Sequence, residues 1–192
     1  MYASSSASSF AAREGEIVGA MAGHPDSTLV LALGNPLRGD DGAGQAVLEA
    51  LSKSGRLPPD VVLVDGGTAG LETALALEGY RQAMILDAAE MGLSPGEWRR
   101  LEYPGCEAAI RAEGAAKGVH EAGLAEALAL ASELGTLPRK VTLFAIQPGE
   151  IAWEAGLSVS VAAAVPDVSQ HVLDAILSCG GDGDGKDPDY RR

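Results

Sequence analysis

The chain has 192 residues, of which 46% are hydrophobic and 21% charged, a composition that fits one globular domain with a sizeable core. Its net charge of -13 at pH 7 argues against a nucleic-acid partner and against binding to anionic membrane surfaces. No run of 18 apolar residues is present, so we expect no segment that spans a bilayer.

The two ends of the sequence differ in composition from its middle. Residues 1–26 are rich in Ala, Ser and Gly without periodicity, which predicts a flexible N-terminal extension, and they lack the pattern of a secretory signal. Residues 180–192 are polar and rich in Gly and Asp, which predicts a disordered tail. The single ordered domain is therefore expected over residues 27–179. The two cysteines have no metal-type spacing, and they fit a reducing cytoplasm.

Strands and helices alternate along the predicted domain. The expected strands, taken in chain order, are 28–33, 61–65, 83–88, 96–103 as a possible edge strand, and 140–148. The expected helices are 42–55, 70–79, 120–135 and 159–178. Pro166 lies inside the last of these and predicts a kink or break near Val165. This alternation predicts an α/β fold, with a mostly parallel sheet and helices on both faces.

Three of the predicted strands carry acidic residues at or just beyond their carboxyl ends, where ligands bind in such sheets. The first strand leads into Asp40 and Asp41, the second ends in Asp65, and the third ends in Asp87. The glycine-rich loop after the first strand therefore brings carboxylates, and not phosphate-binding amides, to the functional edge.

Structural roles compete with functional ones for each acid. Either Asp40 or Asp41 could cap the following helix, whose first N–H groups need an acceptor, but capping cannot explain both. Asp65 in DGGTAG favours bracing a tight turn through its side chain. Asp87 follows the apolar run AMIL, where an unpaired carboxylate is costly, and this setting favours function.

His120 stands just before the long fourth helix, whereas His24 lies in the predicted extension and His171 on the last helix, where a surface or packing role is favoured. Asp41, Asp87 and His120 would together form a three-ligand site with open positions, suited to a divalent metal such as Ni or Zn. The same residues could instead activate water. They are far apart in the sequence, so the fold has to bring them together.

Several motifs fail on physical grounds. GLSPG, residues 92–96, matches the G-x-S-x-G pattern of serine hydrolases, but the residue after Ser94 is Pro95, which has no N–H to donate to an oxyanion. The loop after the first strand lacks both the G-x-G-x-x-G order of dinucleotide-binding proteins and the G-K-[ST] of a P-loop.

Five stretches of the chain occur in the order found in the maturation endopeptidases of NiFe hydrogenases, and the chain resembles this family over residues 27–177. The stretches are LALGNPLRGDDGAGQAVLEAL, VVLVDGGTAGLE, AMILDAAEMGLSPGEW, HEAGLAEALALASELGTLPRKVTLFAIQP and GLSVSVAAAVPDVSQHVL. The block G-N-x-L-x-x-D-D-G-x-G and the block D-G-G-T-x-G are far more specific together than either is alone.

The resemblance implies an α/β/α sandwich with peptidase activity. The expected activity is removal of a short C-terminal extension from the hydrogenase large-subunit precursor, after nickel has been inserted into it. That precursor is the expected partner and the cytoplasm the expected location. The family's metal-contacting residues correspond to Asp41, Asp87 and His120, and the resemblance thus implies both a catalytic and a metal-contacting role for these three.

The mechanism stays open among three accounts. The three residues could bind the nickel already held by the precursor, hold a divalent metal of their own that activates water, or use a carboxylate as a base without metal. We favour nickel sensing together with positioning of the scissile bond. The competing functions are a non-catalytic module that binds nickel or the precursor, and a peptidase of the same fold with another substrate.

Overall fold

The computed structural model describes residues 24–106 and 119–179. Their five-stranded sheet has the order β2-β1-β3-β5-β4. The strands are β1 (Thr28–Ala32), β2 (Val61–Asp65), β3 (Gln82–Ala88), β4 (Trp98–Tyr103) and β5 (Lys140–Ile146). All neighbours pair in parallel except β4, which runs antiparallel to β5 at one edge of the sheet. The predicted mostly parallel sheet, with its edge strand near residues 96–103, is confirmed.

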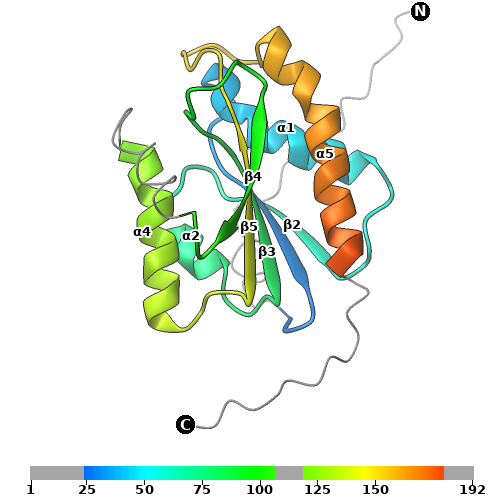
Figure 1. The fold of residues 1–192 in the computed structure, drawn as a ribbon, viewed down its shortest axis with the longest axis vertical. Coiled ribbons are helices and arrows are strands. Elements are labelled where there is room, and N and C mark those ends of the chain that lie inside the picture. Colours follow the sequence, from blue (N-terminus) through cyan, green and yellow to red (C-terminus); the bar gives the residue numbers. More distant parts are fainter. Residues whose placement is uncertain (1–23, 107–118, 180–192) are drawn as a thin grey trace, which may run out of the picture.

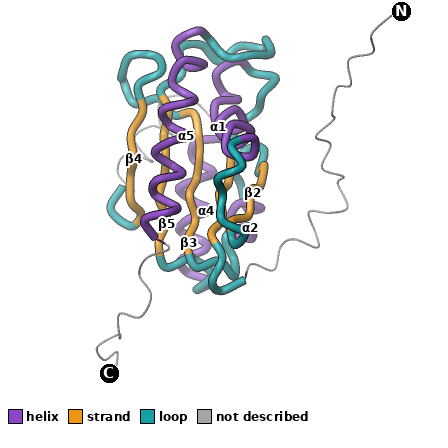
Figure 2. The backbone as a smooth tube through the Cα atoms, turned by 90° about the vertical axis from the view of Figure 1, so that its right-hand side faces the viewer, coloured by secondary structure: helices purple, strands orange, loops and turns teal. Residues whose placement is uncertain are grey.

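Helices cover both faces of this sheet. They are α1 (Ala43–Lys53), preceded by the 3-10 turn η1 (Gly39–Gly42), then α2 (Leu71–Ala76), α4 (Val119–Leu134) and α5 (Val159–Cys179). Figure 1 shows α2 and α4 on one side of the strands and α1 and α5 on the other. Figure 2, turned by 90°, shows α5 running along the strands on the face of the sheet that it covers. The expected three-layer α/β/α sandwich is confirmed. The predicted C-terminal tail, and the predicted N-terminal extension before His24, lie outside the described residues.

The apolar run of β1 is continuous because both of its faces are covered. Leu29 and Leu31 belong to the core under α2 and α4, whereas Val30 and Ala32 belong to the core under α1 and α5. None of these four side chains is accessible to solvent. An amphipathic, alternating strand could not occupy this central position.

The same alternation on β3 decides where its acid lies. Ala83 and Ile85 belong to the α2–α4 core, and Met84 and Leu86 to the α1–α5 core. Because successive side chains of a strand point to opposite faces, Asp87 falls on the face that α2 and α4 cover. Its neighbour Ala88 packs on the opposite face.

The break predicted at Pro166 does not occur, because α5 continues through this residue. Proline cannot donate to the carbonyl of Ala162, but Ala162 and Pro166 are both exposed, so water can reach the unpaired carbonyl. The buried side of the helix, with Val161 and Val168, keeps its packing. Neither α5 nor any other helix in the described part of the chain has the length and apolarity needed to cross a membrane.

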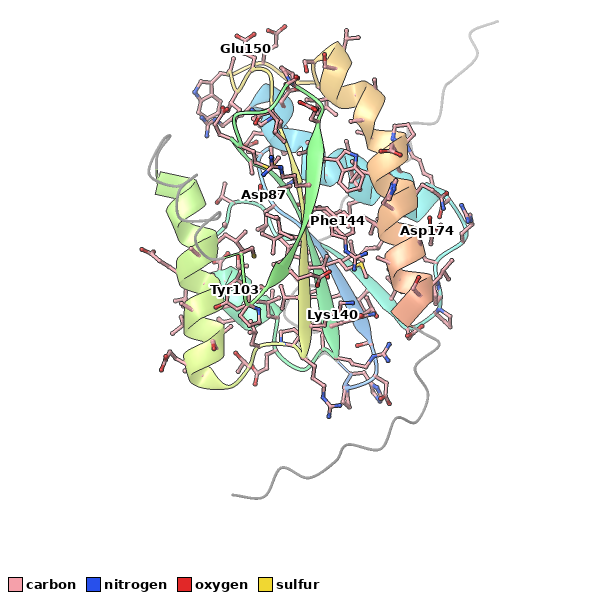
Figure 3. The ribbon with its side chains drawn as sticks, in the orientation of Figure 1. Asp87, Tyr103, Lys140, Phe144, Glu150 and Asp174 are labelled. Atoms are coloured by element: carbon pink, nitrogen blue, oxygen red, sulfur yellow. The ribbon has the colours of Figure 1, made fainter. Side chains whose placement is uncertain are left out.

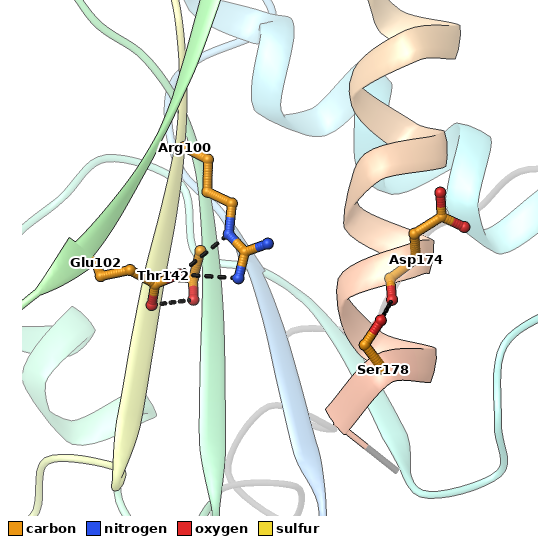
Figure 4. Close-up of polar contacts among 5 residues, drawn as sticks. All are labelled: Arg100, Glu102, Thr142, Asp174 and Ser178. Carbon is orange, nitrogen blue, oxygen red and sulfur yellow. Dashed lines mark hydrogen bonds and ion pairs between the residues drawn. The ribbon is translucent and has the colours of Figure 1, made fainter. Parts of the chain in front are cut away.

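Polar contacts close the edge of the sheet at β4. Glu102 accepts hydrogen bonds from Arg100 on the same strand and from the buried Thr142 of β5 (Figure 4). The guanidinium of Arg100 also lies 6.0 Å from the centre of the Phe144 ring. These contacts cover the α1–α5 core where the sheet ends.

Candidate active site

The loop after β1 folds back tightly on Asp41. Gly34 has a φ of 115°, and a Cβ on it would lie 1.9 Å from the carbonyl oxygen of Asp41, so no other residue fits this position. The N–H of Asn35 donates to Oδ2 of Asp41 at 2.9 Å. Within the described residues Oδ1 of Asp41 accepts no hydrogen bond. The loop thus holds a partly buried carboxylate at the carboxyl end of β1 with one oxygen open.

Asp40 faces a different direction. Neither Asp40 nor Asp41 caps α1, which has no side-chain cap at its N-terminus, so the capping interpretation is wrong for both residues. Its fully buried carboxylate accepts the N–H groups of Gly149 at 2.8 Å, Glu150 at 3.1 Å and Ser158 at 2.6 Å. Burial raises the pKa of this carboxyl. The three N–H donors together lower the pKa by more than burial raises it, so the pKa of Asp40 lies below its ordinary value. Asp40 is an ionised clamp between the first loop and the segment that joins β5 to α5.

Asp65 braces a turn, as its sequence context predicted. Its Oδ1 accepts the N–H of Gly67 at 3.1 Å and the Nε2 of Gln45 at 3.1 Å. The same Nε2 donates to the carbonyl of Gly34 at 2.9 Å, and the N–H of Gly34 donates to the carbonyl of Gly67 at 2.7 Å. The loops after β1 and β2 are therefore fastened together beside Asp41.

Asp87 is the second-to-last residue of β3 and lies opposite Ala145 of β5 in the parallel register. Its side chain is partly buried. In Figure 3 the labelled Asp87 lies beside the sheet toward α4, in agreement with the alternation on β3. This carboxylate belongs to the same carboxyl edge as Asp41, because β1 and β3 are parallel neighbours.

His120 is the second residue of α4, and its side chain lies outside the described set. The place of its backbone follows from Gly123, where a Cβ would lie 2.7 Å from the carbonyl oxygen of Ala69. The first turn of α4 is thus pressed against the loop after β2. Figure 1 shows this end of α4 at the same end of the molecule as η1 and the start of α5.

The fold therefore brings the segments that carry Asp41, Asp87 and His120 to one edge of the sheet. Among the described side chains no three His, Cys, Asp or Glu residues form a metal-binding group, and the side chain of His120 is not among them. Two carboxylates and an imidazole are donors that suit nickel or zinc, and an open oxygen on Asp41 fits that role. The three remain a predicted site.

The residues for which the sequence favoured a structural role over a catalytic one lie in structural settings. Ser94 is exposed, its N–H donates to the carboxylate of Glu97 at 2.6 Å, and its loop leads into β4 and not into a helix. Cys106 is buried in the α2–α4 core. His171 is on the exposed side of α5, with Nδ1 2.9 Å from the carbonyl oxygen of Asp167.

One organising residue, Gln147, was missed from the sequence. Its Oε1 accepts the N–H groups of Met91 at 2.7 Å and Leu93 at 3.2 Å, and its Nε2 donates to Glu90 at 2.9 Å. Gln147 is buried directly after β5 and shapes the loop that follows β3. The sequence did contain one indication of this role, because Gln147 is a polar amide at the end of the apolar run KVTLFAIQP.

The chain is similar in sequence to known proteins over most of its length. The family model described as hydrogenase maturation protease matches residues 45–175. The hydrogenase expression/formation protein HoxM of Cupriavidus necator is 35% identical over 155 residues, which cover 80% of this chain and 75% of that protein. The hydrogenase 2 maturation protease of Escherichia coli K12 is 31% identical over 153 residues, covering 79% and 92%.

Solved structures extend the similarity to three dimensions. The hydrogenase maturating endopeptidase HybD of Escherichia coli superposes with a TM-score of 0.71 and 30% identity, covering 80% of this chain and 94% of that one. The hydrogenase 2 maturation peptidase of a Thaumarchaeota archaeon gives a TM-score of 0.60 and 34% identity, covering 79% and 98%.

Proposed function

The chain belongs to the hydrogenase maturation protease family, which makes it a peptidase, and from this premise we propose that it removes the C-terminal extension of a NiFe hydrogenase large-subunit precursor. The observation that carries the proposal is that Asp41 and Asp87 lie at the carboxyl ends of two neighbouring parallel strands, at the edge where α4, which bears His120 near its start, packs against the loop after β2. The proposed setting is the cytoplasm, which fits a chain with two cysteines whose spacing suggests no metal site.

The proposed chemistry is hydrolysis of one peptide bond. A carboxylate close to the scissile carbonyl can take a proton from the attacking water and return it to the leaving amine. Asp41 and Asp87 are the two carboxylates proposed for this role. Asp41 is held in place by the Asn35 N–H, so its open oxygen is presented in a fixed direction.

Nickel enters the proposal as part of the substrate. The donor set of Asp41, Asp87 and His120 suits a divalent metal that another protein already holds in part. Contact with that metal would let the peptidase distinguish a loaded precursor from an empty one and would fix the scissile bond against the carboxylates. A divalent metal resident in the peptidase is the alternative, in which the same three residues would hold an ion that polarises water.

The test is incubation of the purified protein with the nickel-loaded large-subunit precursor of its host, followed by mass measurement of the precursor. A nickel-free preparation of the same precursor is the matched control. Cleavage of the loaded form alone is the expected result. An intact loaded precursor that still binds the protein would instead support the non-catalytic module.

Metal analysis distinguishes the two roles of nickel. We expect the purified peptidase to carry no stoichiometric metal and to keep its activity after dialysis against a chelator that leaves the nickel in the precursor. A stoichiometric divalent metal whose removal stops cleavage would support a resident ion.

A further inference from the structure

Two large apolar side chains are exposed next to the turn that carries Asp41. Trp153 is 82% exposed and Leu37 is 62% exposed. The guanidinium carbon of Arg38 lies 5.5 Å from the centre of the Trp153 ring. We call these three residues the Trp153 patch.

The chain segment that presents Trp153 is fixed directly to the site. The N–H of Gly39 donates to the carbonyl of Glu154 at 2.6 Å, and the N–H of Asp40 donates to the carbonyl of Glu150 at 3.1 Å. These bonds flank Trp153 on both sides in the sequence, and the carboxylate of Asp40 adds its bonds to residues 149, 150 and 158. Figure 3 shows the labelled Glu150 above the carboxyl edge of the sheet, beyond Asp87.

Because of these hydrogen bonds, the segment that carries Trp153 has less conformational freedom than an ordinary exposed loop. A tryptophan on a loose loop loses conformational freedom when it binds, whereas one on a clamped segment loses little. Buried tryptophans are also among the residues that contribute most to protein–protein binding. The exposed indole is thus prepared for contact, at a fixed place beside Asp41.

We propose that the Trp153 patch is an anchoring surface for the precursor polypeptide next to the scissile bond, an inference that rests on the proposed function. The contacting segment would place an apolar side chain on Trp153 and Leu37 and an oxygen, as a carboxylate or carbonyl, on Arg38. The Nε of Arg38 is buried and has no hydrogen-bond partner among the described residues. An anchor of this kind binds substrate and does not take part in the chemistry.

The charge of the protein favours such a partner over a second copy of this chain. Two copies would each bring a net charge of -13 to the contact, and the exposed Glu150 and Glu154 would add to the repulsion across it. A single cation, Arg38, lies inside the patch, so a partner with an acceptor oxygen is complementary to it.

The experiment measures cleavage of the nickel-loaded precursor over a range of precursor concentrations. We expect Trp153→Ala to raise KM by about tenfold or more while kcat changes little, because an anchor contributes to binding. Trp153→Phe should recover part of the loss, since an aromatic surface remains. The matched control is Trp98→Phe, at the chain's other tryptophan, which donates to Asp167 on α5 and should leave KM unchanged.

A second readout does not depend on turnover. The Trp98→Phe variant keeps Trp153 as its only tryptophan, and its emission should shift to shorter wavelength when the precursor is added. Unchanged KM in Trp153→Ala, or unchanged emission, with a wild-type protein that cleaves normally would overturn the anchoring surface while leaving the proposed function in place. If the wild-type protein leaves the loaded precursor intact, the proposed function fails and the anchoring proposal fails with it. A Trp153-dependent dimer in sedimentation would assign the patch to a second copy instead.

Discussion

The carboxylate of Asp40 accepts the N–H of Ser158 at 2.6 Å, across 118 positions of the sequence. Ser158 directly precedes α5, and Asp40 directly precedes the proposed site residue Asp41. The contact therefore ties the start of the last helix to the turn that carries the site. The two adjacent carboxylates have different roles. Asp40 binds backbone N–H groups and has a structural role, whereas one oxygen of Asp41 accepts no hydrogen bond from the described residues and is open to a ligand.

Asp40→Asn should destabilise the protein, because the variant loses the charge and replaces one acceptor oxygen by a donor opposite backbone N–H groups. Hydrogen bonds to a charged group contribute about 1.5–3 kcal/mol each, and we expect a loss of about 2 kcal/mol in the free energy of unfolding. Urea unfolding at neutral pH measures it. Asp60→Asn, at an exposed aspartate, is the control, and an equal effect in both variants would contradict the clamp.

The stabilisation by Asp40 should also depend on pH. Its folded-state pKa is lowered, so the stabilisation is complete above the unfolded value of about 3.9 and is lost as the pH falls through the folded value. The stability difference between wild type and Asp40→Asn should thus be constant near neutrality and shrink below about pH 4. A difference that instead grows on acidification would show that the carboxyl is protonated in the folded protein.

Asp41→Asn, Asp87→Asn and His120→Ala should each abolish cleavage or slow it by about a hundredfold or more, because each removes a charge or a nitrogen that the proposed chemistry requires. The fold should be kept, and loss of one charge among neighbouring acids can raise the melting temperature. Asp65→Asn is the matched comparison and should be milder, since the amide oxygen can still accept the Gly67 N–H. Normal melting with wild-type cleavage in all three variants would place the active site elsewhere.

Gly123→Ala should impair processing through the backbone alone. Its Cβ would lie 2.7 Å from the carbonyl of Ala69, so the first turn of α4 must move away from the loop after β2. His120 lies on that turn. We therefore expect a large fall in kcat together with only a small fall in the melting temperature. Ser132→Ala, at an exposed position of the same helix, serves as the control. Wild-type kcat in Gly123→Ala would mean that the place of this turn does not matter for cleavage.

Ser94→Ala should leave processing unchanged. Ser94 is exposed, it precedes a proline without an N–H, and its own N–H is bound by Glu97. The assay is the same mass measurement, with Asp41→Asn as the inactive reference. Inactivation by Ser94→Ala, with a normal thermal melt, would revive the serine hydrolase interpretation of GLSPG.

Much of the fold was predictable because the determining patterns are local. A continuous apolar run such as 28–33 requires a strand covered on both faces, and the spacing of strands and helices requires parallel connections. The turn role of Asp65 was likewise predictable, since its partner Gly67 is two residues away. The break predicted at Pro166 was wrong because the carbonyl that loses its hydrogen bond is exposed to water. The sequence alone does not show which side of the helix faces solvent.

The distant contacts were not predictable in the same way. Nothing near Asp40 indicates that its acceptors are satisfied by residues 149, 150 and 158, and the role of Gln147 depends on a loop more than 50 positions earlier. Asp41 and Asp40 are chemically identical neighbours, so only the path of the loop distinguishes the open carboxylate from the clamp.

Cleavage of a nickel-loaded hydrogenase large-subunit precursor by this protein is measured by the mass of that precursor before and after incubation. We expect a loss equal to one C-terminal peptide from the loaded precursor, no loss from the nickel-free precursor, and no loss with Asp41→Asn. A loaded precursor that keeps its full mass in the presence of well-folded wild-type protein would contradict the proposed function.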